Sequence, residues 1–234
     1  MAEADCATNP RIRSGHGPVP APIAAPEVGG AADDLLRALS AHASVKAFPK
    51  NTLVVSEGDK SVDYVYLIRS GRVKVFLCSA EGKEIDLAVL EPGDYFGEMS
   101  LDGGPRSASV MTLARTELAI MRQSEFRKFL AASPDFSMQL IQKLIARTRS
   151  LLKSVKSLAL MDVSDRVARL LLEMATEENG KLIINEKLSK RDIANRVGAT
   201  REMASRVFKD LVASGYIQME NKRITISKQL LRQW

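Results

Sequence analysis

Residues 188–214 read LSKRDIANRVGATREMASRVFKDLVAS and contain the clearest structural signal in the C-terminal part of the chain. The segment 188–197 predicts one helix whose apolar side chains face inward. Gly198 supplies a tight turn, and Thr200 is placed to cap a second helix that ends near Ser214. Two helices of this length joined by a glycine turn predict a helix-turn-helix.

The second helix of this motif carries polar side chains on one face. Arg201, Glu202, Ser205 and Arg206 fall on its first two turns. In a helix whose N-terminal half enters the major groove, arginine can donate two hydrogen bonds to guanine and glutamate can accept one from cytosine. Ser205 and Lys209 are better placed for phosphate or adjacent base contacts. This face therefore predicts the recognition helix of a DNA-binding protein.

A β-hairpin is expected after Gly215. The segments 216–219 and 223–226 alternate in polarity around a turn, and Lys222 and Arg223 on this wing are expected to touch the DNA backbone. Lys190 and Thr200 complete the expected set of DNA-contacting residues. The predicted domain at residues 162–234 is thus a winged helix-turn-helix.

Positive charge is concentrated in the same region. Residues 184–234 hold eleven Lys and Arg against five Asp and Glu, so their formal net charge of +6 equals that of the whole chain. Such a concentration favours a polyanionic partner through phosphate neutralisation and counterion release. Charge alone fits a solvated basic face equally well, but combined with the helix-turn-helix it predicts binding to double-stranded DNA.

The composition excludes several other classes of protein. The 234 residues are 45% hydrophobic, 26% charged and 5% aromatic, which is typical of a globular protein of two domains and not of a collagen-like or disulfide-rich one. No apolar run approaches the roughly 18 residues of a membrane span, and the first thirty residues lack the hydrophobic segment of an export signal. A cytoplasmic protein without membrane contact is expected.

The N-terminal half of the sequence consists of a tail followed by a β-rich region. Residues 1–30 hold five of the nine prolines and predict a disordered tail, with a short helix expected from Asp33. Residues 31–133 are expected to form one domain, because short β-rich runs alternate with glycine turns every eleven to thirteen residues between 44 and 122. This spacing is typical of an antiparallel sandwich or jelly-roll-like β-roll, here of about eight strands. Five of the expected strands are 52–55, 64–68, 73–77, 85–90 and 116–121.

A long helix is expected at residues 134–161. Its apolar residues alternate steps of three and four, as in a coiled-coil seam. The seam consists of Ile141, Leu144, Thr148, Leu151, Val155 and Leu158. Packing against the chain's own roll is the alternative, but the length of the helix favours a parallel homodimer. Residues 162–164 interrupt the seam and place the domain boundary near Met161 to Asp165.

A glycine-rich loop between two strands is the candidate ligand site. Residues 96–110 read FGEMSLDGGPRSASV. Such a loop can aim backbone N–H groups at an anion, while Arg106 can bind a phosphate and Glu98 can accept a hydrogen bond from a sugar hydroxyl. Gly97 permits a close approach of the backbone. The simpler alternative is a surface ion pair between Glu98 and Arg106.

These motifs and their order resemble the CRP/FNR family of bacterial transcription factors over residues 35–234. The resemblance implies an α+β fold with a cyclic-nucleotide-binding β-roll, a long dimerisation helix and a C-terminal winged helix-turn-helix. It implies that Arg147 of the long helix pairs with Glu98, and that Arg201, Glu202 and Arg206 read a TGTGA-like half-site. The residues expected around the nucleotide are Phe96, Gly97, Glu98, Met99, Arg106, Ser107, Ala108, Arg147, Leu151 and Leu152.

One position departs from the pattern of the family. Its nucleotide receptors carry a Thr-Ser pair on the long helix that reaches the adenine ring, whereas this chain has Leu151 and Leu152 there. The loop is also shorter between Glu98 and Arg106. A cyclic mononucleotide, cyclic AMP or cyclic GMP, is the expected ligand, and cyclic di-GMP is the alternative. Leu151 lies on the seam and is expected to stabilise the dimer without reading a base.

Other chemistries lack the residues that they need. The two cysteines, Cys6 and Cys78, cannot form an iron–sulfur or four-thiolate zinc site, and His42 is the only histidine outside the tail. No metal cluster or nucleophile–base pair suggests an enzyme. We expect a ligand-responsive homodimer with no cofactor, whose partners are an operator, a cyclic nucleotide and RNA polymerase. The alternative is a constitutive DNA-binding factor whose pocket is vestigial.

Overall fold

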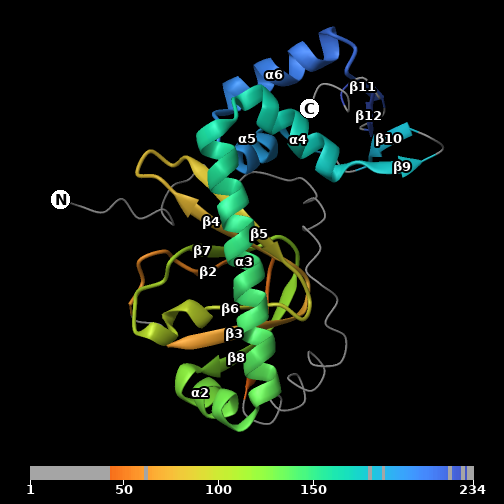
Figure 1. Cartoon of the computed structure of the whole chain (residues 1–234). Helices are drawn as coiled ribbons and strands as arrows, with labels where there is room; N and C mark the ends of the chain where they lie inside the picture. Colours follow the sequence, from red (N-terminus) through yellow and green to blue (C-terminus); the bar gives the residue numbers. More distant parts are fainter. Residues whose placement is uncertain are drawn as a thin grey trace. The chain divides into compact units, whose positions relative to one another are not determined.

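The computed structural model describes residues 43–60, 63–178, 181–185, 188–220, 223–227 and 230. Contacts within the chain divide it into two compact units, the first including residues 86–150 and the second including the chain from Leu151 onward. Each unit has its own hydrophobic core. Figure 1 shows the helices and strands that form the units. The predicted tail, the short helix from Asp33, and the positions of Cys6, His42 and Lys222 lie outside the described residues.

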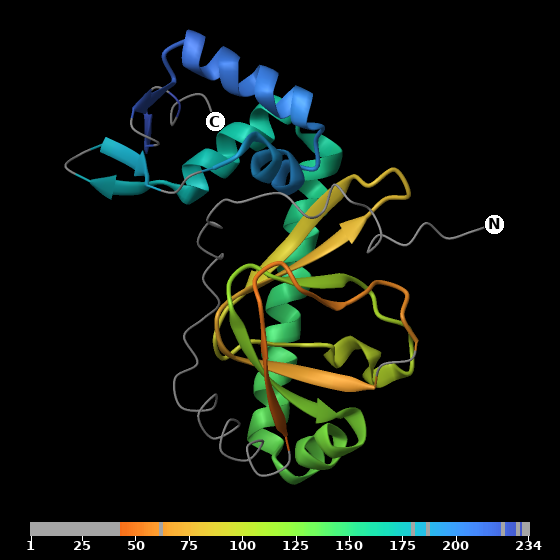
Figure 2. The ribbon, with the colours of Figure 1, turned by 180° about the vertical axis from the view of Figure 1, so that it is seen from behind.

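The described part of the first unit contains two four-stranded sheets that form a β-roll (Figures 1 and 2). Their strand orders are β1-β8-β3-β6 and β2-β7-β4-β5. The strand pairs β1–β8, β3–β8, β3–β6, β2–β7 and β4–β7 are antiparallel. All five strands expected from the sequence are present, with ends shifted by one or two residues. The strands are β1 Ser44–Phe48, β2 Leu53–Val55, β3 Tyr64–Ser70, β4 Val73–Cys78, β5 Glu84–Leu90, β6 Tyr95–Phe96, β7 Ser109–Thr112 and β8 Thr116–Arg122.

Strand β3 separates two halves of the core. Tyr66 and Ile68 on one side pack between the two sheets. Val65 and Leu67 on the other side pack under the helices that follow the roll. Because successive side chains of a strand point to opposite faces, a central strand covered on both sides must be apolar at consecutive positions. The sequence YVYLI at the start of β3 meets this requirement.

Two helices cover the outer face of this sheet. Helix α2, Gln123–Ala132, buries Phe126, and helix α3, Pro134–Leu160, buries Leu140 against the same cluster. Proline at the first turn suits a helix start, because its missing N–H would have had no partner there. None of the helices in the described ranges carries an apolar stretch that could cross a bilayer.

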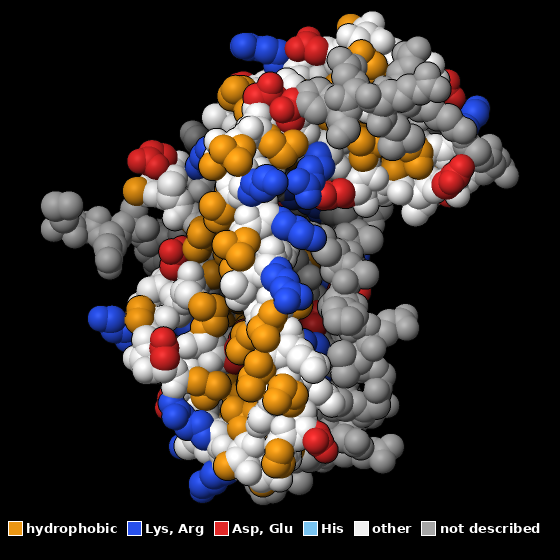
Figure 3. Space-filling model, in the orientation of Figure 1, with side chains coloured by type: hydrophobic (Ala, Val, Ile, Leu, Met, Phe, Trp, Pro, Cys, Tyr) orange, Lys and Arg blue, Asp and Glu red, His pale blue; other side chains and the backbone are white. Residues whose placement is uncertain are grey.

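Helix α3 also carries an exposed apolar stripe, which is visible as a line of hydrophobic side chains in Figure 3. The predicted seam is wrong at Leu144, because that side chain is partly buried against the core of the roll and Ile145 is exposed in its place. Leu151 and Leu158 of the predicted seam are exposed too, but a set of exposed positions that starts at Met138 and includes Leu152 also alternates steps of three and four. We call this set the α3 stripe; it consists of Met138, Ile141, Ile145, Thr148, Leu152 and Val155.

The second unit contains three helices and a four-stranded sheet. The helices are α4 Val163–Met174, α5 Lys190–Val197 and α6 Arg201–Ala213. The sheet has the order β11-β12-β10-β9, with β9 Thr176–Glu178, β10 Lys181–Ile184, β11 Ile217–Glu220 and β12 Arg223–Ile226. The predicted hairpin is the β11–β12 pair, and β9 and β10 extend it into a larger sheet that the sequence did not indicate.

Side-chain caps set the helix ends of this unit. The Ser189 hydroxyl accepts a hydrogen bond from the backbone N–H of Asp192, whose carboxylate accepts one from the N–H of Ser189. This capping box begins α5 at Lys190, two residues later than predicted. Gly198 ends α5 at a φ of 62°, in the left-handed region that glycine adopts without strain.

Candidate functional site

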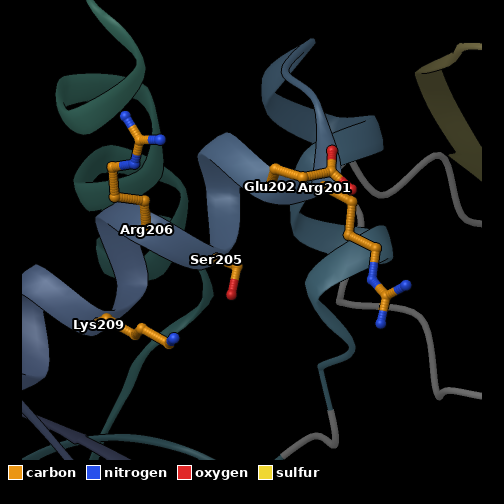
Figure 4. Close-up of a pocket in the computed structure, with 5 residues that line it drawn as sticks. All are labelled: Arg201, Glu202, Ser205, Arg206 and Lys209. Atoms are coloured by element: carbon orange, nitrogen blue, oxygen red, sulfur yellow. The ribbon is translucent and has the colours of Figure 1, made fainter.

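The polar face of α6 is the first candidate site. Arg201, Glu202, Ser205, Arg206 and Lys209 line one surface pocket (Figure 4). On the opposite face of the helix the side chains are buried in the core of the second unit, and these are Ala204, Val207, Phe208 and Leu211. Because one face is anchored in the core, the polar face is presented to solvent as a rigid row. All five side chains predicted for this face are therefore together.

Thr200 fixes where this row begins. Its hydroxyl oxygen accepts a hydrogen bond from the backbone N–H of Met203 and so caps α6. The turn before it is closed by a bond from the N–H of Ala199 to the carbonyl of Ala194. The predicted cap is confirmed, and the hydroxyl proton can still be donated to a phosphate.

Two other residues expected at DNA are held by the protein itself. The Lys190 ammonium lies 2.8 Å from the centroid of the Phe208 ring, and burial lowers its pKa to about 8. Arg223 donates to the Asn185 side-chain oxygen at 2.7 Å and lies 3.3 Å from a carboxylate oxygen of Glu178. Lys190 is half-buried, whereas the Arg223 side chain stays 56% exposed, and the DNA contacts expected of both remain predictions.

The second candidate site is the loop after β6. Gly97 adopts a φ of 89° and precedes a short 3-10 helix, η3 Glu98–Asp102. A Cβ atom added at Gly97 would lie 2.8 Å from a guanidinium nitrogen of Arg106 and 2.8 Å from the carbonyl oxygen of Tyr64. Glycine is required here for both its backbone conformation and its lack of a side chain.

Arg106 is buried under this loop, with 4% of its surface exposed. Its guanidinium donates to the carbonyl oxygens of Gly97 at 2.9 Å and Tyr64 at 2.6 Å. It also donates to the Ser100 hydroxyl at 2.9 Å, which receives a second bond at 2.5 Å from the Gln123 amide. Arg106 thus holds the loop together, and its role as a phosphate ligand remains a prediction. Ser100 and Gln123 were not expected at the site, and only Ser100 lies within the quoted loop.

Glu98 is buried and pairs with the long helix. One of its carboxylate oxygens lies 2.6 Å from a guanidinium nitrogen of Arg147, and the other terminal nitrogen of Arg147 donates to the carbonyl of Tyr95 at 2.7 Å. The pair implied by the family resemblance is present, and the alternative pair of Glu98 with Arg106 is not formed. Glu98 therefore belongs to a defined link between the loop and α3.

Lys143 forms a second link one helical turn earlier. Its ammonium bonds the Asp94 carboxylate and the Gly93 carbonyl, each at 3.1 Å. Lys143 and Arg147 both lie over the ring of Tyr95, each 5.1 Å from its centroid. Lys143 was not predicted, although its spacing of four residues from Arg147 places the two on one helix face.

The remaining predicted ligand residues have different surroundings. Phe96 is buried and stacks on Tyr66 with ring centroids 4.8 Å apart, so its side chain is part of the core. Ser107 is exposed and donates to the sulfur of Met99, which is also exposed. Of the others, Ala108 is partly exposed, and Leu151 and Leu152 are 44% and 63% exposed.

Comparison with known proteins matches both units. Residues 45–133 match the family model of the cyclic nucleotide-binding domain, and residues 165–232 match that of the Crp-like helix-turn-helix domain. The first match spans β1 to α2, including the loop with Glu98 and Arg106. The second spans α4 to the β11–β12 hairpin, including the polar face of α6.

Relatives align over most of their length. The CRP-like cAMP-activated global transcriptional regulator of Mycobacterium tuberculosis is 34% identical over 203 residues, which cover 85% of this chain and 90% of that protein. The cAMP-activated global transcriptional regulator CRP of Pasteurella multocida is 31% identical over 202 residues, covering 83% and 95%.

A solved structure shares the fold over a similar length. The c-di-GMP responsive global regulator CLP of Xanthomonas campestris superimposes with a TM-score of 0.72 at 27% identity, covering 83% of this chain and 98% of that one. These relatives span both units, so the order of the units is common to them and to this chain.

Proposed function

This chain belongs to the CRP/FNR family of transcription factors, and from that premise we propose that it is a homodimeric regulator that binds a cyclic nucleotide in its β-roll and a pseudo-palindromic operator through α6. The observation that carries the proposal is the row on α6, in which Arg201, Glu202 and Arg206 share one exposed face above a buried one. Such a protein acts where bacterial DNA is, in the cytoplasm, and its proposed protein partner is RNA polymerase.

The row supports direct readout of a half-site. Guanidinium groups at Arg201 and Arg206 can each donate two hydrogen bonds to a guanine, and the Glu202 carboxylate can accept one from cytosine. Footprinting on an operator selected from random duplexes tests this. We expect protection with dyad symmetry, and a loss of about 1 to 3 kcal/mol in operator binding for each of Arg201→Ala and Arg206→Ala. Protection without a dyad, or unchanged affinity of both variants, would contradict the proposal.

The α3 stripe supports the dimer. Its steps of three and four are those of a two-stranded coiled coil, and its side chains are exposed in the single chain. Pairing two stripes would remove this apolar surface from water. A dimer with twofold symmetry would present its two α6 helices to half-sites about 34 Å apart, one helical turn of DNA.

The loop after β6 supports a cyclic nucleotide as the ligand. Arg147 occupies one carboxylate oxygen of Glu98, and the second oxygen can accept a hydrogen bond from a ribose hydroxyl. The exposed Ser107 hydroxyl and the backbone N–H groups that follow it can bind a phosphate. Because Glu98 also contacts α3, occupation of the loop can bias the arrangement of the helix.

A second candidate is a constitutive DNA-binding factor. It is favoured by Leu151 and Leu152, which add apolar surface to α3 where a base-reading hydroxyl is expected, and by Arg106, whose guanidinium serves the carbonyls of Gly97 and Tyr64. Calorimetry on nucleotide-free protein with cyclic AMP, cyclic GMP and cyclic di-GMP separates the candidates. Binding coupled to a change in operator affinity supports the first, and equal operator affinity with and without all three nucleotides supports the second.

A further inference from the structure

Three turns meet at one end of the β-roll. They join β1 to β2, β3 to β4, and β7 to β8. The backbone N–H of Leu113 in the β7–β8 turn donates to the carbonyl of Arg72 in the β3–β4 turn at 2.8 Å. A Cβ atom added at Gly71 would lie 2.4 Å from the carbonyl oxygen of Arg115, so these two turns are in direct contact.

Two buried threonines hold the turns in place. The Thr112 hydroxyl donates to the carbonyl of Pro49 at 2.6 Å and accepts from the N–H of Thr52 at 2.8 Å, which ties the β1–β2 turn to β7. The Thr116 hydroxyl accepts from the N–H of Arg72 at 3.3 Å and lies 3.0 Å from the carbonyl of Ala114. Neither threonine has measurable exposed surface, so the three turns form one rigid element.

Four basic side chains lie on these turns or next to them: Lys50 and Arg115 are exposed, Arg72 is half-buried, and Arg69 is exposed near the end of β3. Within the ranges that the structure describes, none of the four forms an ion pair with an acidic side chain. We call this set the basic turn platform. The gathering of four basic side chains without an ion-paired acid contrasts with the balance of acidic and basic residues over the chain before residue 184.

The chemistry of the platform fits carboxylates on a protein. Three of its four cations are arginines, whose planar guanidinium binds a carboxylate through two parallel hydrogen bonds. Between them lie the exposed Pro49 and the half-buried Leu113 and Ala114. A guanidinium binds a phosphate in the same way, so the apolar side chains favour a protein partner here, since arginine beside an apolar centre is typical of protein interfaces.

We propose that the basic turn platform docks a segment of a partner protein that is rich in Asp and Glu and carries a few apolar side chains. This surface lies on different turns from the loop with Glu98 and on a different unit from α6. It therefore adds a protein contact to the proposed binding of DNA and nucleotide and depends on neither.

The test uses the full chain and a fluorescently labelled peptide of glutamate interspersed with leucine. The variant Arg69→Gln/Arg115→Gln removes two exposed platform cations. Its matched control, Lys60→Gln/Lys128→Gln, removes two exposed cations elsewhere on the first unit, so both variants change the net charge equally. At low ionic strength we expect the peptide to bind the platform variant about threefold to tenfold more weakly than the wild type, and the control within about twofold.

A second arm uses a short non-operator duplex in place of the peptide. We expect all three proteins to bind the duplex alike, because the platform is proposed to recognise carboxylates. Undetectable peptide binding, an equal loss for the control variant, or a loss of duplex affinity that matches the loss of peptide affinity would each overturn the proposal. Operator footprints of the platform variant separate a failure here from a failure of the proposed function.

Discussion

At the scale of single residues, Tyr95 has a buried hydroxyl group that lowers the stability of the fold. Its ring is buried between Phe136 of α3 and the cations of Lys143 and Arg147, and its hydroxyl has no hydrogen-bond partner among the described residues. A buried hydroxyl without a partner destabilises the fold, because it has lost its bonds to water. Burial also raises the pKa of Tyr95 well above its usual value.

We expect Tyr95→Phe to raise the free energy of unfolding by about 1 kcal/mol at neutral pH. Because the pKa is raised in the folded state, the phenol ionises first in the unfolded chain. The stability of the wild type is therefore unaffected by this ionisation below the unfolded pKa near 10 and falls as the pH rises above it. The wild type should therefore lose stability above about pH 10 more steeply than the variant. Calorimetric unfolding from pH 7 to 11 measures both effects, with the exposed Tyr64→Phe as control.

Gly97 is the second residue with a specific steric role. Gly97→Ala places a methyl group 2.8 Å from atoms of Arg106 and Tyr64, at a φ of 89°. Gly103→Ala is the matched control, since its φ of 85° imposes the same backbone strain while nothing lies within 4 Å of the added Cβ atom. We expect each to cost about 1 kcal/mol for the backbone and Gly97→Ala to cost at least about 1 to 2 kcal/mol more. Equal unfolding free energies would show that the loop can move aside.

At the scale of elements, Arg166 of α4 joins two helix ends. It donates to the carbonyl of Val197, the last residue of α5, at 2.8 Å, and to the carbonyl of Met161, just after α3, at 2.7 Å. Carbonyls at the C-terminal ends of helices lack partners within the helix, so a cation that binds them is favourable.

Arg166→Met keeps the apolar stem and removes these bonds, and we expect it to destabilise the second unit by about 1 to 3 kcal/mol. Arg169→Met on the same helix removes only the exposed pair with Glu173 and should cost less than about 0.5 kcal/mol. Hydrogen exchange of the α5 amides reports the difference. Equal protection of α5 in the two variants would contradict a joining role for Arg166.

Elements that rest on local signals could be predicted from the sequence. The helix-turn-helix depends on Ser189, Gly198 and Thr200, each of which acts on backbone groups within four residues of itself. Strands β9 and β10 were missed because β9 reads only TEE and β10 is placed by its pairing with β12, about forty residues later. That pairing is invisible to any local pattern.

The same limit explains the errors at the candidate sites. The loop motif includes Phe96, but a local pattern does not predict that its ring stacks on Tyr66 across the β3–β6 pair. Leu144 and Ile145 are both apolar and adjacent, so a helical period alone does not decide which of them meets the roll. The roles assigned to Glu98, Arg106 and Ser107 at a nucleotide remain predictions.

At the scale of the whole molecule, the α3 stripe is the proposed contact between the two copies of the chain. Ile145→Glu places a charge in the middle of the proposed coiled-coil seam, and we expect the dimer to dissociate at least about 100-fold more readily. Ala146→Glu adds the same charge to an exposed neighbour outside the stripe and should leave the dimer intact. Sedimentation measures both, and operator affinity should fall only where the dimer is lost. Dissociation that is the same for both variants would show that the seam lies elsewhere.

Because β3 is covered on both faces, only some fragments of this protein can fold as soluble domains. One face of the sheet is hydrophobic and consists of Val65, Leu67, Ala119 and Met121. Phe126 of α2 and Leu140 of α3 shield this face from water. A fragment that stopped at Arg122, the end of β8, would leave that face bare and would be prone to precipitate. A fragment made to study the first unit alone should retain the chain through Leu144, so that β3 stays covered on both faces.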